Sequence, residues 1–157
     1  MRWRPDGTGR DVWATAHIPG AAYVDWRADL TETSESGETL LLAGPDQVAR
    51  TLATAGVGDG ATVVIYDDTV GLFAARTWWS LRVYGLESAR ILDGGYPAWA
   101  EEGRPVSSAT APPPPGRFTP RAQPRMRLTT ADVRALLSSP DVLLLDARAP
   151  RTCPSGR

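Results

Sequence analysis

Apolar residues recur at helical spacing in two segments of the chain, and a short apolar run follows each of them. The first segment predicts a helix that begins near Pro45 and ends at the glycines around Gly56 and Gly58. Its apolar face consists of Val48, Leu52 and Ala55. The β-branched run Thr62–Tyr66 then ends in two aspartates. A run this short between turn residues is typical of a strand that is buried on both faces.

A second helix is predicted over Leu72–Tyr84, after Gly71 and before a capping Gly85. Its apolar stripe consists of Leu72, Ala75, Trp79 and Val83. Ala89–Leu92 is predicted to be another strand, and Pro97–Glu102 a short helix with proline at its first position. This alternation of helices and strands predicts an α/β domain with a mainly parallel central sheet flanked by helices.

The loops that follow the two strands are the predicted places for ligands, because ligands bind beyond the carboxyl ends of parallel strands. These loops are Asp67–Gly71 and Asp93–Tyr96.

The region before Pro45 is less regular. It predicts one short strand at Ala21–Trp26 and an exposed polar loop at Thr31–Gly44.

The composition changes after Gly103, where four consecutive prolines indicate a stiff, extended linker. We therefore divide the chain into a domain at residues 1–106, a linker at 107–125 and the start of a second α/β unit at 126–157. In this second unit, Thr130 is predicted to cap a helix over Ala131–Leu137, and Asp141–Asp146 to form a buried strand. Two elements cannot bury a core by themselves, so we expect marginal stability.

The charge balance gives no reason to expect nucleic acid or an acidic membrane surface as a partner. The 157 residues contain 17 basic and 18 acidic side chains, and the net charge is −1. No apolar run approaches the roughly 20 residues that span a bilayer, and the N-terminus does not resemble a signal peptide. The single cysteine excludes an internal disulfide. We therefore expect a cytoplasmic protein.

Adjacent carboxylates, Asp67 and Asp68, follow the first predicted strand. They could form an acid–base pair or bind a metal ion, but neighbouring strand residues point to opposite faces. The simpler interpretation is that one of them caps the following helix. Arg76, one turn inside that helix, either pairs with one of these aspartates or lies on the surface.

The other candidate residues favour structural roles. His17, the only histidine, has no metal-ligating cluster near it in the sequence and is interpreted as locally hydrogen-bonded. Trp78, Trp79 and Trp99 are predicted to be core residues rather than a ligand platform. Cys153 lies near the C-terminus without a helix start to activate it, and is interpreted as an inert, exposed thiol.

Several segments together resemble the rhodanese-like sulfurtransferases with two domains, the thiosulfate and 3-mercaptopyruvate sulfurtransferases. The resembling segments are Trp3–Gly7, His17–Ala21, Asp25–Trp26, Val63–Asp68, Gly71–Trp79, Leu92–Trp99 and Leu144–Arg148. The motif positions within them are His17, Gly20, Asp25, Asp67, Asp68, Gly71, Arg76, Asp93, Gly94, Gly95, Trp99, Asp146 and Arg148. The resemblance extends to about Pro150. It implies a nearly complete first domain, whose first strand belongs before Met1, and a truncated second domain.

The resemblance implies transfer of sulfane sulfur from thiosulfate or 3-mercaptopyruvate to cyanide or a thiol through a cysteine persulfide. Asp67 stands at the position of that cysteine, and a carboxylate cannot accept sulfur. We therefore assign no catalytic residue, and we expect this chain to be inactive alone. No metal and no cofactor are implied. The implied partners are the missing second domain and, in the intact enzyme, small anionic sulfur compounds.

The resemblance ends near the C-terminus, and two other functions were considered for the chain. Beyond Pro150, Arg151 and Thr152 depart from the family pattern, and Cys153 matches no cysteine of the family. The alternative function is a non-catalytic binding or regulatory module that buries the Asp67–Gly71 loop against a partner. A phosphatase-like function is rejected, because the segment Asp67–Arg76 has neither the thiol nor the spacing of a Cys-x5-Arg loop.

Overall fold

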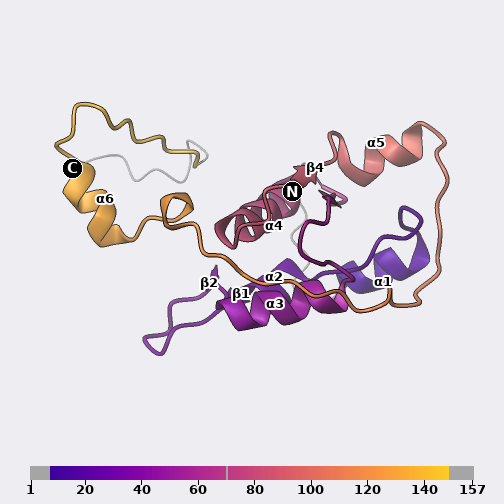
Figure 1. Ribbon diagram of the computed structural model, residues 1–157. Coiled ribbons are helices and arrows are strands. Elements are labelled where there is room, and N and C mark those ends of the chain that lie inside the picture. The colour runs from indigo at the N-terminus through magenta and orange to yellow at the C-terminus, as the bar shows by residue number, and fades with distance from the viewer. Residues whose placement is uncertain (1–7, 70, 149–157) are drawn as a thin grey trace. The chain divides into compact units, whose positions relative to one another are not determined.

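The computed structural model describes residues 8–69 and 71–148 (Figure 1). The chain divides into two compact units, Met1–Met126 and Arg127–Arg157. The elements of the first unit are α1 (Thr8–Thr15), α2 (Trp26–Leu30), β1 (Thr31–Glu32), β2 (Leu41–Leu42), α3 (Pro45–Thr54), β3 (Val63–Ile65), α4 (Leu72–Val83), β4 (Ala89–Ile91), α5 (Gly95–Glu101) and the 3-10 turn η1 (Pro124–Met126). The second unit contains α6 (Thr130–Leu136).

β3 and β4 form a parallel pair, with Val63 opposite Ala89 and Ile65 opposite Ile91. The α/β fold and the parallel pairing are therefore as predicted. The prediction that the first strand is buried on both faces is wrong, because the side chain of Val64 is 58% exposed. Within the described residues β3 pairs with β4 alone, so its second edge has no neighbouring strand.

The segment before α3 is more ordered than predicted. Asp25 caps α2, so Ala21–Trp26 is not a strand: the helix begins at Trp26, and no ladder pairs the residues before it. The predicted exposed loop at Thr31–Gly44 contains the antiparallel pair β1–β2. Its residue Leu42 is 3% exposed because it packs in the core.

The two main helices begin where the sequence predicts, but one of them buries a different face. α3 starts at Pro45 and buries Val48 and Leu52, as predicted. α4 buries Ala74 and Leu81. Leu72 is 45% exposed and Ala75 is exposed too, so the predicted stripe is wrong at its first two residues and right at Trp79 and Val83. Both β3 and β4 contact α4, and these contacts select the buried face.

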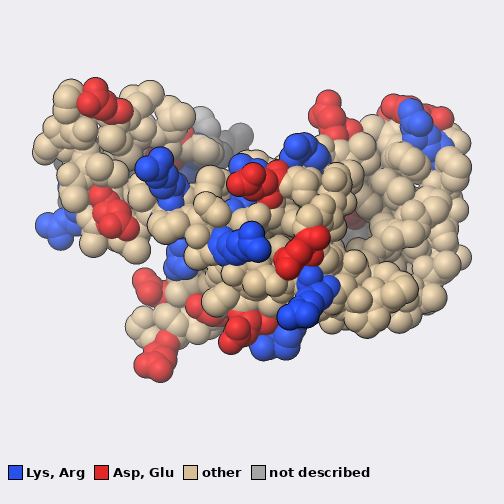
Figure 2. Space-filling view, viewed as in Figure 1, with Lys and Arg blue, Asp and Glu red and all other residues tan. Residues whose placement is uncertain are grey.

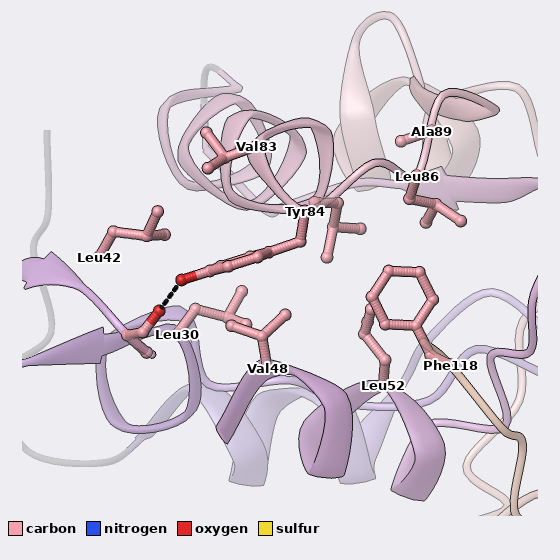
Figure 3. Packing of buried hydrophobic residues seen from close by; sticks show 11 residues of the cluster. Leu30, Leu42, Val48, Leu52, Val83, Tyr84, Leu86, Ala89 and Phe118 are labelled. Carbon is pink, nitrogen blue, oxygen red and sulfur yellow. Dashed lines mark hydrogen bonds between the residues drawn. The ribbon is translucent and has the colours of Figure 1, made fainter. Parts of the chain in front are cut away.

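The core lies between α3, α4 and the two-stranded sheets (Figure 3). The hydroxyl of Tyr84 donates a buried hydrogen bond to the carbonyl of Ala43, at 2.5 Å. Phe118, from the segment predicted to be a linker, is 8% exposed and belongs to this core. Its neighbour Thr119 donates two hydrogen bonds to the carboxylate of Asp59, at 2.8 and 2.9 Å, which lower the pKa of that carboxyl. The Pro-rich segment is thus fixed along the first unit.

Two other predictions need correction. α5 begins at Gly95 rather than Pro97, because Gly94 adopts the left-handed conformation and serves as its N-cap. Trp99 is only half-buried and lies outside the core cluster. Its indole N–H donates to the carbonyl of Pro105, at 2.8 Å.

In the second unit, α6 is capped by Thr129 rather than Thr130. The side chains of Thr129 and Asp132 form a reciprocal capping box. The predicted buried strand at Asp141–Asp146 is wrong, because Leu143 and Leu145 are 82% and 85% exposed and the segment pairs with no described strand. The predicted division into residues 1–106, 107–125 and 126–157 stays a prediction.

Charges are distributed without a dominant sign. On the face shown in Figure 2, acidic and basic side chains are interspersed, in agreement with the net charge of −1. None of the described helices is both long and apolar enough to cross a membrane. The predicted cytoplasmic location stays a prediction.

Candidate functional site

The loop between β3 and α4 is organised around the carboxylate of Asp67. Its Oδ1 accepts hydrogen bonds from the backbone N–H groups of Thr69 and Gly71, at 3.0 and 3.1 Å. Its Oδ2 accepts from the N–H groups of Phe73 and Ala74, both at 3.0 Å. The last two donors belong to the first turn of α4, where N–H groups have no partner within the helix. The prediction that one of the two aspartates caps this helix is confirmed for Asp67.

The electrostatics of this loop favour an anion. Burial by itself raises the pKa of Asp67, but the backbone N–H groups of Ala74, Thr69 and Gly71 outweigh burial and lower that pKa below its ordinary value. Gly71, at φ +84, adopts the left-handed conformation that lets its N–H join this ring. A ring of N–H groups at a helix N-terminus is a general anion-binding device, and here it holds the protein's own carboxylate.

The loop after β4 supports the first loop from the side. The N–H of Tyr96 donates to the backbone carbonyl of Asp67, at 2.9 Å. A Cβ on Gly95 would lie 2.6 Å from that carbonyl oxygen, and Gly95 has φ +58. Only glycine therefore allows the two loops to approach this closely. Asp93 accepts a hydrogen bond from the N–H of Gly94, at 3.1 Å, next to this contact.

His17 and its neighbours connect a third segment to β3. His17 is 2% exposed, stacks on Trp13, and donates from Nδ1 to the carbonyl of Trp13, at 2.7 Å. This agrees with the prediction of a locally bonded histidine. The N–H of Ile18 donates to the hydroxyl of Tyr66, at 3.2 Å. Burial raises the pKa of the Tyr66 hydroxyl, although the hydrogen bond from Ile18 acts in the opposite direction. Gly20 follows, with φ +80.

The segment Asp25–Trp26 reaches the start of α4 through an aromatic contact. The carboxylate of Asp25 accepts from the N–H groups of Arg27 and Ala28, at 2.9 and 3.1 Å, which fixes the start of α2. The ring of Trp26 then stacks on Phe73, with ring centroids 5.3 Å apart. The sequence analysis did not single out Tyr66 or Phe73 as site residues, although both lie within the resembling segments Val63–Asp68 and Gly71–Trp79.

The remaining candidates of the first unit are Asp68, Arg76, Trp78 and Trp79. Asp68 is exposed. Arg76 donates to the carbonyl of Leu40, at 2.9 Å, and its guanidinium lies over the ring of Trp79. The half-buried Trp78 and Trp79 pack against the core, as predicted.

In the second unit, Asp146 and Arg148 form a bidentate ion pair with hydrogen bonds of 2.5 to 2.9 Å. Cys153 and the segment Trp3–Gly7 lie outside the described residues. The structure therefore brings most of the motif residues together around the Asp67 loop, and it places Asp146 and Arg148 in the other unit.

A cavity of about 820 Å³ adjoins this loop. One wall consists of β3 and the residues flanking it, from Ala61 to Thr69, and residues 20–27 line the cavity as well. The cavity is large enough for a small ligand or for a segment of chain. Its lining is more apolar than polar, so it favours an apolar occupant over a small anion.

A parallel pair with an anion-holding loop at the carboxyl end of one strand and a glycine pair after the other agrees with the rhodanese-like domain that the sequence motifs predicted. The chain belongs to the rhodanese-like domain family, whose model matches residues 5–102. It is similar to the probable 3-mercaptopyruvate sulfurtransferase of Pseudomonas aeruginosa, with 35% identity over 144 residues, which cover 90% of this chain and 51% of that protein. The human 3-mercaptopyruvate sulfurtransferase is 34% identical over 152 residues, which cover 94% of this chain and 50% of that protein.

Solved structures agree with this family. The crystal structure of SseA from Escherichia coli, which belongs to the 3-mercaptopyruvate sulfotransferases, superimposes with a TM-score of 0.74 at 25% identity. The match covers 87% of this chain and 53% of that one. The chain thus spans about half the length of the curated relatives that it matches.

Proposed function

We propose that this chain is the cysteine-free first domain of a two-domain sulfurtransferase, together with the start of the second domain, and that it transfers no sulfur by itself. In the intact enzyme, sulfane sulfur would pass from thiosulfate or 3-mercaptopyruvate to cyanide or a thiol through a cysteine of the second domain. The observation that carries this proposal is that Asp67 occupies the ring of N–H donors after β3.

The chemistry of that ring supports the proposal. Four N–H groups that converge on one point stabilise a thiolate or a persulfide anion as well as a carboxylate. Sulfur transfer needs a nucleophile that can form and break an S–S bond, and a carboxylate cannot do so. With Asp67 in place, the ring is also closed to thiosulfate, because its donors are already engaged and the carboxylate repels a second anion.

The first experiment measures thiocyanate formation from thiosulfate and cyanide, and then from 3-mercaptopyruvate and cyanide, with the purified chain. We expect rates equal to the buffer blank. Thiocyanate formation that disappears in a Cys153→Ser variant would contradict the proposal, because Cys153 is the only cysteine in the chain.

A gain-of-function variant tests the loop directly. In the Cys153→Ser background, we expect Asp67→Cys to have a thiol pKa below the ordinary value of about 8.5, measured from thiolate absorbance, because the N–H ring favours the anion. The thiolate would attack the outer sulfur of thiosulfate and sulfite would leave with the electron pair of the broken S–S bond. Mass spectrometry would then detect the gain of one sulfur atom. Cyanide would remove that sulfur as thiocyanate and regenerate the thiolate.

The matched control is Asp68→Cys in the same background, one residue further along the loop. We expect this thiol to titrate at a higher pH and to gain sulfur more slowly, because the ring converges on position 67. Equal behaviour of the two cysteines would refute an anion-stabilising role of the loop.

A further inference from the structure

Two guanidinium groups converge on the loop that joins α4 to β4 (Figure 1). Nη1 of Arg82, in the last turn of α4, donates to the backbone carbonyl of Glu87, at 2.7 Å. Nη1 of Arg90, the second residue of β4, donates to the same oxygen, at 3.0 Å. Because both nitrogens bind one oxygen, they lie no more than about 6 Å apart, and two positive charges at this distance repel each other.

Neighbouring groups hold both guanidiniums in place. The guanidinium of Arg82 lies over the ring of Trp78, 5.9 Å from the ring centroid. The indole N–H of Trp78 donates to the carbonyl of Ala89, at 3.2 Å, and Nη1 of Arg90 donates to that carbonyl too, at 2.9 Å. One indole and two carbonyls therefore link the two arginines in a closed set of contacts. Side chains that are fixed in this way lose less conformational entropy when a ligand binds.

The positive charge of this pair exceeds the negative charge around it. The carbonyl groups at a helix C-terminus amount to about half of an elementary charge, whereas the two guanidiniums carry two full charges. In the described part of the chain, neither Arg82 nor Arg90 forms an ion pair with a carboxylate. The side chain of Glu87 is exposed, and it is the backbone carbonyl of Glu87, not its carboxylate, that binds both arginines.

Most of the donor groups of the two arginines are still available. A guanidinium has five N–H donors, arranged as a flat fork that matches an oxyanion. The contacts with the described residues use only Nη1 of each side chain, which leaves the N–H groups on Nε and Nη2. Arg90 is exposed and Arg82 is half-buried, so a small ligand can reach them from solvent.

We propose that Arg82 and Arg90 bind a doubly charged tetrahedral oxyanion, of the class of sulfate and phosphate, beside the α4–β4 loop. Each guanidinium would donate through the N–H groups that the protein does not use, and the anion would relieve the repulsion between the two arginines. The site lies at the amino ends of the parallel strands, whereas the Asp67 loop follows the carboxyl end of β3. The inference is therefore independent of the proposed function. Its residues lie within positions 78–90, inside the region that the family model matches.

The test is a titration of the full chain with sodium sulfate, followed by NMR through the arginine Nε–H signals and the backbone N–H signals of residues 86–91. Sodium chloride at equal ionic strength is the reference. We expect shifts that saturate with sulfate, with a dissociation constant on the order of 1 mM, and no saturation with chloride. Inorganic phosphate at about pH 8 is expected to shift the same signals, because it is mostly a dianion there.

Substitutions in the site separate charge from shape. Arg82→Gln and Arg90→Gln are each expected to raise the dissociation constant for sulfate at least about 10-fold, because each removes one of the two charges. Arg82→Lys and Arg90→Lys keep the charge but lose the fork, and each is expected to raise it about three- to tenfold. Glu87→Gln should lower it about two- to threefold, because it removes a repelling carboxylate and keeps the carbonyl that holds both arginines. Circular dichroism and urea unfolding verify that each variant is folded.

Arg104 provides the matched control. Its guanidinium also lies over a tryptophan ring, 5.4 Å from the centroid of Trp99, but it forms an ion pair with Glu102. Arg104→Gln removes the same charge from another part of the surface and is expected to change the dissociation constant by less than about twofold. Shifts that chloride reproduces at equal ionic strength, glutamine variants of Arg82 and Arg90 that bind sulfate as the wild type does, or an equal loss for Arg104→Gln would each overturn the proposal.

Discussion

Replacing Asp67 by asparagine tests how strongly the N–H ring depends on a carboxylate. Asparagine keeps one acceptor oxygen but presents an NH₂ group at the other position, so the N–H groups of two ring residues lose their acceptor. Leaving a buried donor unsatisfied costs about 1–3 kcal/mol. Because the Asp67 loop is half-buried, we take the lower end for each of the two donors and expect Asp67→Asn to reduce the free energy of unfolding by roughly 2 kcal/mol at pH 7.

The pH dependence distinguishes loss of the charge from a change of shape. The pKa of Asp67 is lowered by folding, so the carboxylate stabilises the fold fully above its ordinary pKa of 3.8. This contribution is lost as the pH falls through the lower pKa of the folded state. A protonated carboxyl resembles asparagine in offering the ring a single good acceptor oxygen. The difference between wild type and Asp67→Asn should therefore be constant from about pH 7 to about pH 5 and shrink below 3.8.

Urea unfolding, followed by circular dichroism at several pH values, measures this difference. Asp68→Asn is the control, since it removes the same charge from the exposed neighbouring residue, and it should cost less than about 1 kcal/mol. Equal costs for the two variants at pH 7, or a cost for Asp67→Asn that persists unchanged in acid, would refute the assignment of the ring as an anion site.

Two other substitutions test contacts that only the folded chain contains. Gly95→Ala places a Cβ about 2.6 Å from the carbonyl oxygen of Asp67. In urea unfolding it should lower the free energy of unfolding by roughly 1–3 kcal/mol more than Gly103→Ala, because Gly103 has a similar φ but open space around it. Equal losses for the two variants would contradict the close approach of the two loops. Phe118→Ala should cost about 3 kcal/mol, because it opens a cavity in the core. Val106→Ala, at an exposed position just before the Pro-rich segment, should be nearly neutral. Similar values for these two variants would show that Phe118 does not anchor the Pro-rich segment to the core.

Local sequence signals were sufficient for the type and approximate position of the main elements. Pro45 marks the start of α3, and the short apolar run before Asp67 marks β3. The sequence also predicted that Asp67 or Asp68 caps the following helix, and the structure shows that Asp67 does so. These features depend on backbone preferences and on hydrogen bonds between residues close in sequence, so a single sequence contains the necessary information.

The candidate site could be predicted only in part. The motifs indicated which loops to examine, but not that the carbonyl of Asp67 lies against Gly95, nor that Tyr66 and Phe73 tie two other segments to the same loop. These contacts join residues far apart in the chain. Their distances depend on how the elements pack, and no local pattern encodes them.

Burial was decided by the tertiary structure alone. The sequence determined that the runs at Val63–Ile65 and at residues 142–145 are apolar, and it placed Phe118 in a segment with the composition of a linker. The fold left Val64 and the 142–145 run exposed and buried Phe118. The physical reason is that hydrophobic stabilisation depends on the area that other segments remove from water, which is a property of the assembled chain and not of the run itself.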